Sequence, residues 1–295
     1  MTTGPSISLL GRLYDTVPQF LRPVEFRIVK TVEEFKIASQ LVYTEYLKRN
    51  YVKPNPARLK LSLYHALPTT ATFIAVHRRL GIIGTVSVVE DSPLGLPMDE
   101  AYKTEVDVLR RQGLRVAEVS MLALDGRLFG QKVFTLFHAK KLLFTLRLFK
   151  IMFDYLRSST PTDELVACFN PKHQILYEFL QLQPLGGLKT YTAANSNPSV
   201  ARHLNIRDTE QHAASHAAYQ LFYGKKPSPA PFAEKLKFSP SDLETLFVHT
   251  LPVFASASPT ELAHIKSCYP TYPFADILNA AHTSPPQFGL MLPQS

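Results

Sequence analysis

The chain has 295 residues, and its 45% share of hydrophobic residues is that of a globular protein able to bury a core. No apolar run approaches the roughly 20 residues needed to span a bilayer and no secretory signal is recognisable, so we expect a cytoplasmic protein. Lys and Arg number 32 against 24 Asp and Glu, and the net charge of +8 favours an acidic partner, although no zinc-finger, ribonucleoprotein or polybasic motif indicates nucleic acid.

The N-terminal part of the chain predicts a leader followed by a strand and a helix. Residues 1–25 carry scattered apolar side chains that suit a short amphipathic helix, packed against the protein body or a membrane surface. A strand is expected from Phe26, and a helix from Thr31 to about Arg49. Glu34 lies three residues after Thr31, the spacing of a capping box in which each side chain accepts the other residue's backbone N–H.

Two β-rich runs and a polar helix are predicted next. Residues 71–77 and 82–89 are rich in Ile and Val, and the tight Leu-Gly connection between them predicts an antiparallel hairpin. Asp99 is placed to cap a helix over residues 100–111, and Gly113 to end it. An antiparallel hairpin at this point excludes a chain of repeated βαβ units.

The following region alternates strands with helices. Strands are expected over residues 116–124 and 165–169, with a long helix over 131–156 between them. A helix over 173–182 and a final hairpin region near 186–192 complete the pattern. We therefore predict an α/β fold with a mixed, mostly antiparallel sheet flanked by helices.

The C-terminal third predicts a helical appendage. Strand patterns stop near residue 200, and the Pro-rich segment 227–231 predicts a linker. Beyond it, Ser239 or Ser241 can cap one helix, and Ser258 or Thr260 another. The chain thus divides into a leader (1–25), a main domain (26–206), the helical appendage (207–285) and a disordered tail (286–295).

The two cysteines predict neither a disulfide nor a metal site. Cys168 and Cys268 fall in differently patterned segments, and two reduced thiols are expected in a cytoplasmic protein. No group of Cys and His residues has the spacing of metal ligands, so no metal is predicted.

Glu118 is the first candidate for chemistry. It lies in the apolar strand 116–124, and because side chains alternate along a strand it shares a face with Ser120. A buried carboxylate is costly unless it has a partner, and one with a raised pKa is a suitable base for an amine nucleophile. The structural alternative is a carboxylate on an exposed sheet face or in an ion pair.

Five basic residues fall within one stripe of about 100° along the long helix. The structural interpretation is the solvated face of an otherwise buried helix. The functional alternative is a docking surface for an acidic carrier protein, which the charges would steer. The five residues are Lys132, Lys140, Arg147, Lys150 and Arg157.

Two further segments carry candidate chemistry. Residues 127–132, Arg-Leu-Phe-Gly-Gln-Lys, join a strand to the long helix, and backbone N–H groups at a helix N-terminus can bind a phosphate. Asn170 is followed seven positions later by Tyr177 in the next helix. On the residues alone, Tyr177 is a core aromatic and His173 a surface or capping histidine.

Taken together, these segments resemble the N-acyl amino acid synthase branch of the GNAT acyltransferase superfamily and, more distantly, the acyl-homoserine lactone synthases. The resemblance extends over residues 26–206. Its parts, in chain order, are Gly84-Thr85, Asp91-Ser92, Leu94-Gly95-Leu96-Pro97, Leu109-Arg110-Arg111, Ala117-Glu118-Val119-Ser120, 127–132 and 170–177.

The resemblance implies an enzyme of the GNAT fold. It implies transfer of a long-chain fatty acyl group to the amine of an amino acid or related small amine. The donor would be the phosphopantetheine thioester of acyl carrier protein, or acyl-CoA, with no permanently bound cofactor. Glu118 would take a proton from the amine or orient it, and Tyr177 would protonate the departing thiolate. Backbone amides of the central strand would hold the oxyanion.

Two sets of binding residues follow from the same resemblance. The substrates would contact Ser120, Leu122, Asn170 and His173. The carrier protein or its phosphopantetheine would contact Arg127, Gly130, Lys132, Lys140 and Arg147.

The chain departs from the family pattern at two points. Lys132 stands where the phosphate turn has a small residue, which disfavours the pyrophosphate of coenzyme A and tolerates a single phosphate. Residues 121–123 lack the Arg that lactone synthases carry after their matching Glu, which disfavours S-adenosylmethionine as a substrate. The candidates for binding the carboxylate of the acceptor are Arg78, Arg79 and Arg115.

Two other functions are retained as alternatives. A coenzyme A-dependent N-acetyltransferase predicts a complete pyrophosphate turn. A non-catalytic GNAT-like binding module predicts that substitution of Glu118 affects stability alone.

Overall fold

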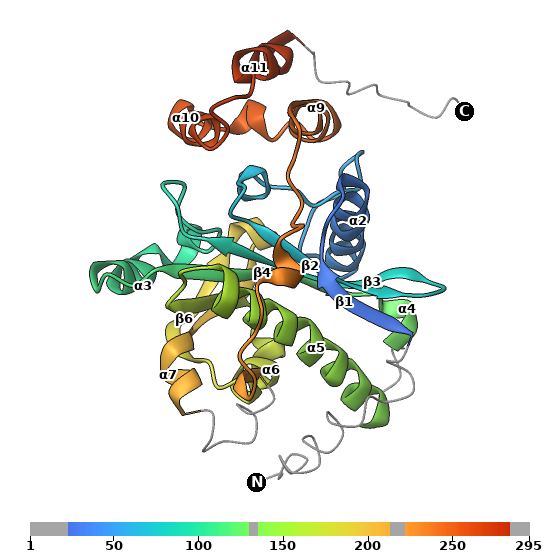
Figure 1. Cartoon of the computed structure of the whole chain (residues 1–295), viewed down its shortest axis with the longest axis vertical. Helices are drawn as coiled ribbons and strands as arrows, with labels where there is room; N and C mark the ends of the chain where they lie inside the picture. Colours follow the sequence, from blue (N-terminus) through green and yellow to red (C-terminus); the bar gives the residue numbers. More distant parts are fainter. Residues whose placement is uncertain (1–22, 130–134, 213–221, 284–295) are drawn as a thin grey trace.

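The computed structural model describes residues 23–129, 135–212 and 222–283, and within them seven strands form one sheet in the order β1-β2-β3-β4-β5-β7-β6 (Figure 1). The predicted tail, and the leader up to residue 22, lie outside these ranges. The strands are β1 (Val24–Ile28), β2 (Ala71–His77), β3 (Gly81–Glu90), β4 (Val116–Leu124), β5 (Glu164–Phe169), β6 (Gln183–Tyr191) and β7 (Asn197–Asn205). The α-helices are α2 (Val32–Lys48), α3 (Asp99–Arg111), α4 (Gly126–Phe129), α5 (Thr135–Ser159), α6 (Gln174–Phe179), α7 (Ile206–Gln211), α9 (Pro240–Glu244), α10 (Pro259–Ser267) and α11 (Phe274–Thr283).

The sheet is mixed and mostly antiparallel, as predicted. Each neighbouring pair of strands is antiparallel except β4 and β5, which are parallel. A parallel pair requires a crossover connection, and α5 supplies it between the end of β4 and the start of β5. The hairpin of β2 and β3 pairs Ala71 with Val88 and His77 with Gly81.

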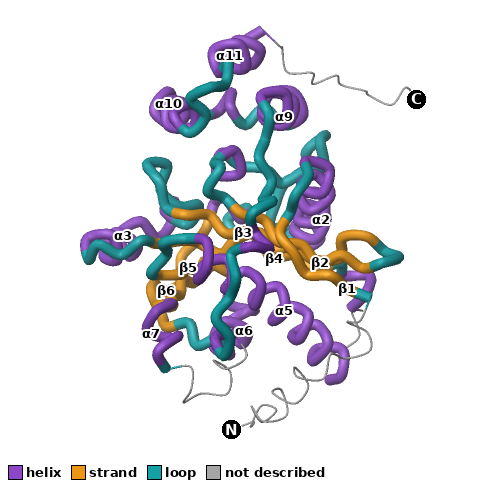
Figure 2. The backbone as a smooth tube through the Cα atoms, in the orientation of Figure 1, coloured by secondary structure: helices purple, strands orange, loops and turns teal. Residues whose placement is uncertain are grey.

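Helices cover both faces of the sheet (Figure 2). On β2, Phe73 packs in the cluster formed with α5, whereas its neighbour Ile74 packs with Phe35 of α2. Side chains alternate between the faces of a strand, so α2 and α5 lie on opposite faces. Both helices contact β3, at the centre of the sheet.

Local capping agrees with the predictions in part. Thr31 accepts the backbone N–H of Glu34 at 3.2 Å, but the Glu34 carboxylate accepts that of Lys30 at 3.0 Å, so the predicted capping box is wrong. Asp99 is also not the cap of α3: its carboxylate accepts the Leu96 N–H and binds the Arg110 guanidinium. In both cases an arginine holds the carboxylate, Arg27 for Glu34 and Arg110 for Asp99.

The appendage is helical, as predicted, and packs on the α2 side of the sheet (Figure 1). Ser239 caps α9 and Ser258 caps α10 through capping boxes. The backbone N–H of Leu236 donates to the carbonyl of Val29 at 2.9 Å. The end of the Pro-rich segment is docked as well, since Phe232 is buried against the aromatic rings of the α5 side.

Three smaller observations complete the fold. Gly113 follows α3 with φ +75°, the left-handed conformation expected of a residue that ends a helix. Cys168 and Cys268 are free thiols. Among the described residues, no helix is long and apolar enough to cross a membrane.

Candidate active site

A cavity of about 620 Å³ opens where β4 and β5 separate. The two strands pair from Val116 and Glu164 to Val119 and Ala167, and β4 then continues to Leu124 along the cavity. Both strands therefore present side chains and backbone to the same space, an arrangement that suits a thioester lying between them.

A β-bulge at Met121 lies beside this opening. Ser120 pairs with Ser87 and Ala123 with Thr85, so two residues of β4 face one residue of β3. Met121 has φ +54°, a conformation that non-glycine residues rarely adopt. A bulge interrupts the regular hydrogen-bond ladder and redirects the backbone groups next to it, which is common beside active sites.

Glu118 is buried at the wall of the cavity, with a residual exposure of 2%. Burial raises its pKa to about 8, the hydrogen bond from the Met98 N–H opposes this rise, and the Asp99 carboxylate adds to it. No ion pair to Glu118 occurs in the part of the chain that the structure describes. The structural alternative for Glu118, a carboxylate on an exposed sheet face or in an ion pair, is therefore not what the structure has.

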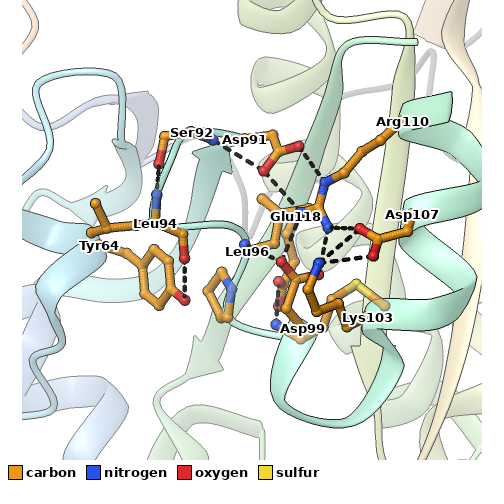
Figure 3. A network of polar contacts seen from close by, with 12 residues as sticks. Tyr64, Asp91, Ser92, Leu94, Leu96, Asp99, Lys103, Asp107, Arg110 and Glu118 are labelled. Atoms are coloured by element: carbon orange, nitrogen blue, oxygen red, sulfur yellow. Dashed lines mark hydrogen bonds and ion pairs between the residues drawn. The ribbon is translucent and has the colours of Figure 1, made fainter. Parts of the chain in front are cut away.

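The loop that leads to Met98 is held by Arg110 (Figure 3). The guanidinium binds Asp91, Asp99 and Asp107, each with a shortest distance of 2.7 Å. Asp99 in turn accepts the Leu96 N–H at 3.0 Å. This network fixes the backbone that donates to Glu118.

Tyr177 lies on the other side of the opening. Its buried ring stacks on Phe169 of β5, with ring centroids 3.6 Å apart and an interplanar angle of 7°. Burial raises the pKa of its hydroxyl, so the group stays protonated at neutral pH. Asn170 caps the short turn before α6 by accepting the Lys172 N–H at 3.1 Å, and this turn directs α6 and Tyr177 toward the cavity.

The structure brings together the predicted substrate-binding and catalytic residues. Desolvation, followed by the charge of Lys141, lowers the pKa of the exposed His173 at the cavity rim. The predicted residues that line the cavity are Glu118, Ser120, Leu122, Asn170, His173 and Tyr177.

The predicted donor-binding residues do not gather there. Arg127 is exposed and paired with Asp125, and neither it nor Arg147 belongs to the described cavity lining. Gly130, Lys132 and the side chain of Lys140 lie outside the described residues.

The predicted basic stripe is not a continuous solvated face. Arg157 is 2% exposed and binds Glu210 and the Phe222 carbonyl, and Lys150 pairs with Asp154. Chain segments after β7 cover the end of α5, which helix periodicity alone could not indicate.

The three arginines considered for an acceptor's carboxylate also lie elsewhere. None of Arg78, Arg79 and Arg115 appears in the described lining of the cavity, and Arg115 binds Asp163 at 2.8 Å. The cations that do line it were missed by the sequence analysis: Arg49, Lys60 and Lys141. Apolar and polar residues alternate around Lys60, which indicates an extended segment but not what its polar side chains face.

Comparisons with known proteins show which family the chain resembles. The family model described as N-acyl amino acid synthase FeeM matches residues 37–205. The solved structure of FeeM, an N-acyl amino acid synthase from uncultured soil microbes, is 28% identical with a TM-score of 0.52, covering 64% of this chain and 93% of that one. An N-acetyltransferase from Staphylococcus aureus Mu50 is 9% identical with a TM-score of 0.40, covering 62% of this chain and 98% of that one. The AHL synthase LasI is 12% identical with a TM-score of 0.40, covering 73% of this chain and 97% of that one. A search of curated protein sequences found no match.

Proposed function

The chain belongs to the N-acyl amino acid synthase FeeM family and is an N-acyltransferase, and from that premise we propose its donor, its acceptor and its catalytic residues. The donor is a long-chain fatty acyl thioester on the phosphopantetheine of acyl carrier protein. The acceptor is the amine of an amino acid or related small amine.

The proposal rests on one observation. The buried carboxylate of Glu118 lies beside a largely apolar cavity, where the parallel strands β4 and β5 separate. The volume of about 620 Å³ lies within the roughly 300–1,000 Å³ of small-molecule sites. Apolar side chains on the side toward α5 and α6 suit an acyl chain: Leu122, Leu124, Leu142, Phe169 and Leu176.

Glu118 acts on the acceptor. Its carboxylate takes one proton from the acceptor's ammonium, directly or through a water molecule, and the neutral amine attacks the thioester carbonyl carbon. The carbonyl oxygen becomes an oxyanion, and backbone N–H groups beside the Met121 bulge stabilise it.

Tyr177 acts on the leaving group. As the C–S bond breaks, its hydroxyl donates a proton to the thiolate, and the second proton of the amine restores the hydroxyl. The products are an N-acyl amide and the free thiol of phosphopantetheine, with one proton released from Glu118 to solvent.

The cavity rim suits a donor with one phosphate. Arg49, Lys141 and His173 line the same side of the cavity, and the positive charges of Arg49 and Lys141 lower the pKa of His173. A phosphodiester would offset this concentration of charge. We retain Lys140 and Arg147 as contacts for the acidic surface of the carrier protein itself.

The test is a competition between donors on the purified full chain. A long-chain acyl carrier protein and the matching acyl-CoA are each offered with a pool of amino acids, and mass spectrometry identifies the products. Product from the carrier protein at low micromolar donor supports the proposal. Product from acyl-CoA alone assigns the coenzyme A-dependent alternative, and no product with either donor, in a folded protein, contradicts both.

A further inference from the structure

Four basic side chains line the cavity in the described ranges, and they divide into two groups. Arg49, Lys141 and His173 form one group at the rim, in which Lys141 and His173 are exposed and Arg49 pairs with Glu45 at 2.8 Å. Lys60 stands apart from them: its carboxylate neighbour is Glu100, and it also lies near the buried His65, whose pKa burial lowers to about 4. The two groups therefore serve different parts of a bound substrate.

The backbone of Lys60 is held in place by Ser39 of α2. The Lys60 N–H donates to Ser39 Oγ at 3.1 Å, and that hydroxyl donates to the Lys60 carbonyl at 2.8 Å. Ser39 itself is 5% exposed, so this double contact is shielded from water. The side chain of Lys60, in contrast, lines the cavity.

The residues on either side of Lys60 determine which way it points. Leu59 and Leu61 belong to the same buried cluster as Leu243 and Phe247 of the appendage, whereas Lys60 and Ser62 line the cavity. This alternation is that of an extended segment, whose successive side chains point to opposite sides. The appendage thus packs on one side of the segment and leaves Lys60 on the other.

The Lys60 ammonium is half-buried and forms no ion pair with any residue in the described part of the chain. Burial lowers its pKa, and the Glu100 carboxylate opposes this effect. A partly desolvated cation without a salt-bridge partner gains from an anionic ligand.

The segment that carries Lys60 contacts the loop over residues 91–98, and so does the Glu118 carboxylate. The Tyr64 hydroxyl donates to the Leu94 carbonyl at 3.4 Å, and four residues later the Met98 N–H donates to Glu118. Lys60 and Glu118 line the same cavity, and the segments that carry them both meet the loop before α3.

We propose that Lys60 binds the carboxylate of the acceptor while Glu118 receives its amine, so that the acceptor is an amino acid with a free carboxylate. This inference rests on the proposed function, and it adds the residue that selects amino acids over simple amines. Lys60 is a specificity residue, because it touches the acceptor at a distance from the atoms that react.

The test compares acceptors with and without the carboxylate in the wild-type chain and in Lys60→Met. Wild type should acylate an amino acid with a KM roughly 10- to 100-fold below that of its primary amide, as expected for one charged hydrogen bond. In Lys60→Met the KM of the amino acid should rise to that of the amide, with kcat and the donor's KM little changed. Lys53→Met, an exposed lysine outside the cavity lining, is the matched control.

A binding measurement separates this inference from the proposed function. Calorimetry of an N-acyl amino acid and of its primary amide, with wild type and Lys60→Met, needs no turnover. Tighter binding of the free acid by wild type, lost in Lys60→Met, supports the inference even where turnover is slow. Equal binding of acid and amide by wild type overturns it, whether or not the chain acylates amines.

Discussion

The backbone N–H of Met98 donates a 2.8 Å hydrogen bond to Oε2 of Glu118. This bond joins the loop before α3 to the middle of the central strand β4, and it partly offsets the cost of burying a carboxylate. The resulting pKa of about 8 leaves Glu118 able to gain and lose a proton near neutral pH. A base is most effective when its pKa lies close to the working pH.

The first prediction concerns pH. Because Glu118 must be ionised to accept a proton and its pKa is about 8, kcat/KM should rise about tenfold per pH unit below that value and level off above it. The measurement is a pH profile with two acceptors whose amines differ in pKa. An inflection that follows the acceptor's amine, and not the enzyme, would count against Glu118 as the base.

The second prediction concerns stability. The pKa of Glu118 is raised on folding from about 4.5 to about 8, so the stability it contributes is complete below pH 4.5 and is lost as the pH rises to 8. The side chain of Glu118→Gln is uncharged at every pH, so the variant does not lose stability as the pH rises. Urea unfolding should show the variant more stable than wild type at pH 8, by on the order of a few kcal/mol, with the difference shrinking toward pH 5. A variant less stable at pH 8 would be inconsistent with a buried, unpaired carboxylate.

The third prediction concerns Arg110, which binds three aspartates around the Met98 loop. Arg110→Met should lower the stability by roughly 1–3 kcal/mol, since the site is partly solvated, and should lower kcat through displacement of Met98. The plateau pH of the rate profile should shift as well, because Glu118 loses its donor. Lys103→Met is the control, because exposed Lys103 pairs with Asp107 alone among the described residues and its loss should change stability by less than about 1 kcal/mol. An unchanged pH profile in Arg110→Met would show that Arg110 does not position Glu118.

The fourth prediction concerns Tyr177. Phenylalanine at this position keeps the stacking on Phe169 and removes only the hydroxyl, so stability should change by less than about 1 kcal/mol. With a natural thioester kcat should fall roughly 100-fold, as for the loss of a general acid. An activated aryl thioester, whose thiolate needs no proton, should restore most of the rate. Equal losses with both donors would indicate that Tyr177 has only a packing role.

The fifth prediction concerns the appendage. The buried Tyr269 hydroxyl donates to the Ala66 carbonyl at 2.7 Å, just after the segment that carries Lys60. Tyr269→Phe leaves that carbonyl without its donor and should destabilise the chain by roughly 1–3 kcal/mol. The KM of the acceptor should rise more than that of the donor, because the appendage supports the acceptor's end of the cavity. A change in the KM of the donor alone would contradict a role for the appendage at the acceptor's end of the cavity.

The sheet could be predicted from local patterns, and the cluster around Glu118 from local patterns together with the family resemblance. Alternation along residues 116–124 placed Glu118 and Ser120 on one side of β4, whereas the resemblance assigned Asn170 and Tyr177 to the same site. The bulge at Met121 carries no such pattern, because its backbone conformation depends on how β4 pairs with β3.

What could not be predicted depends on side-chain contacts that no local period encodes. Asp99 was expected to cap α3, but Arg110 and the Leu96 N–H hold its carboxylate. Arg157 was expected on a solvated face, but residues near 210 and 222 cover it. Lys60 lies in a short alternating segment whose orientation depends on Ser39 and on the appendage, so the alternation alone could not show that Lys60 faces the cavity.

The central claim is that Glu118 is the catalytic base of an N-acyltransferase, and one paired measurement tests it most directly. Wild type and Glu118→Gln are each given a long-chain acyl carrier protein and amino acids at pH 8, and product formation is measured beside the free energy of unfolding of the same samples. The predicted result is N-acyl amino acid from wild type and a rate lower by roughly 100-fold or more in a variant that is at least as stable. A folded variant that retains the wild-type rate would contradict the claim and leave Glu118 with a structural role only.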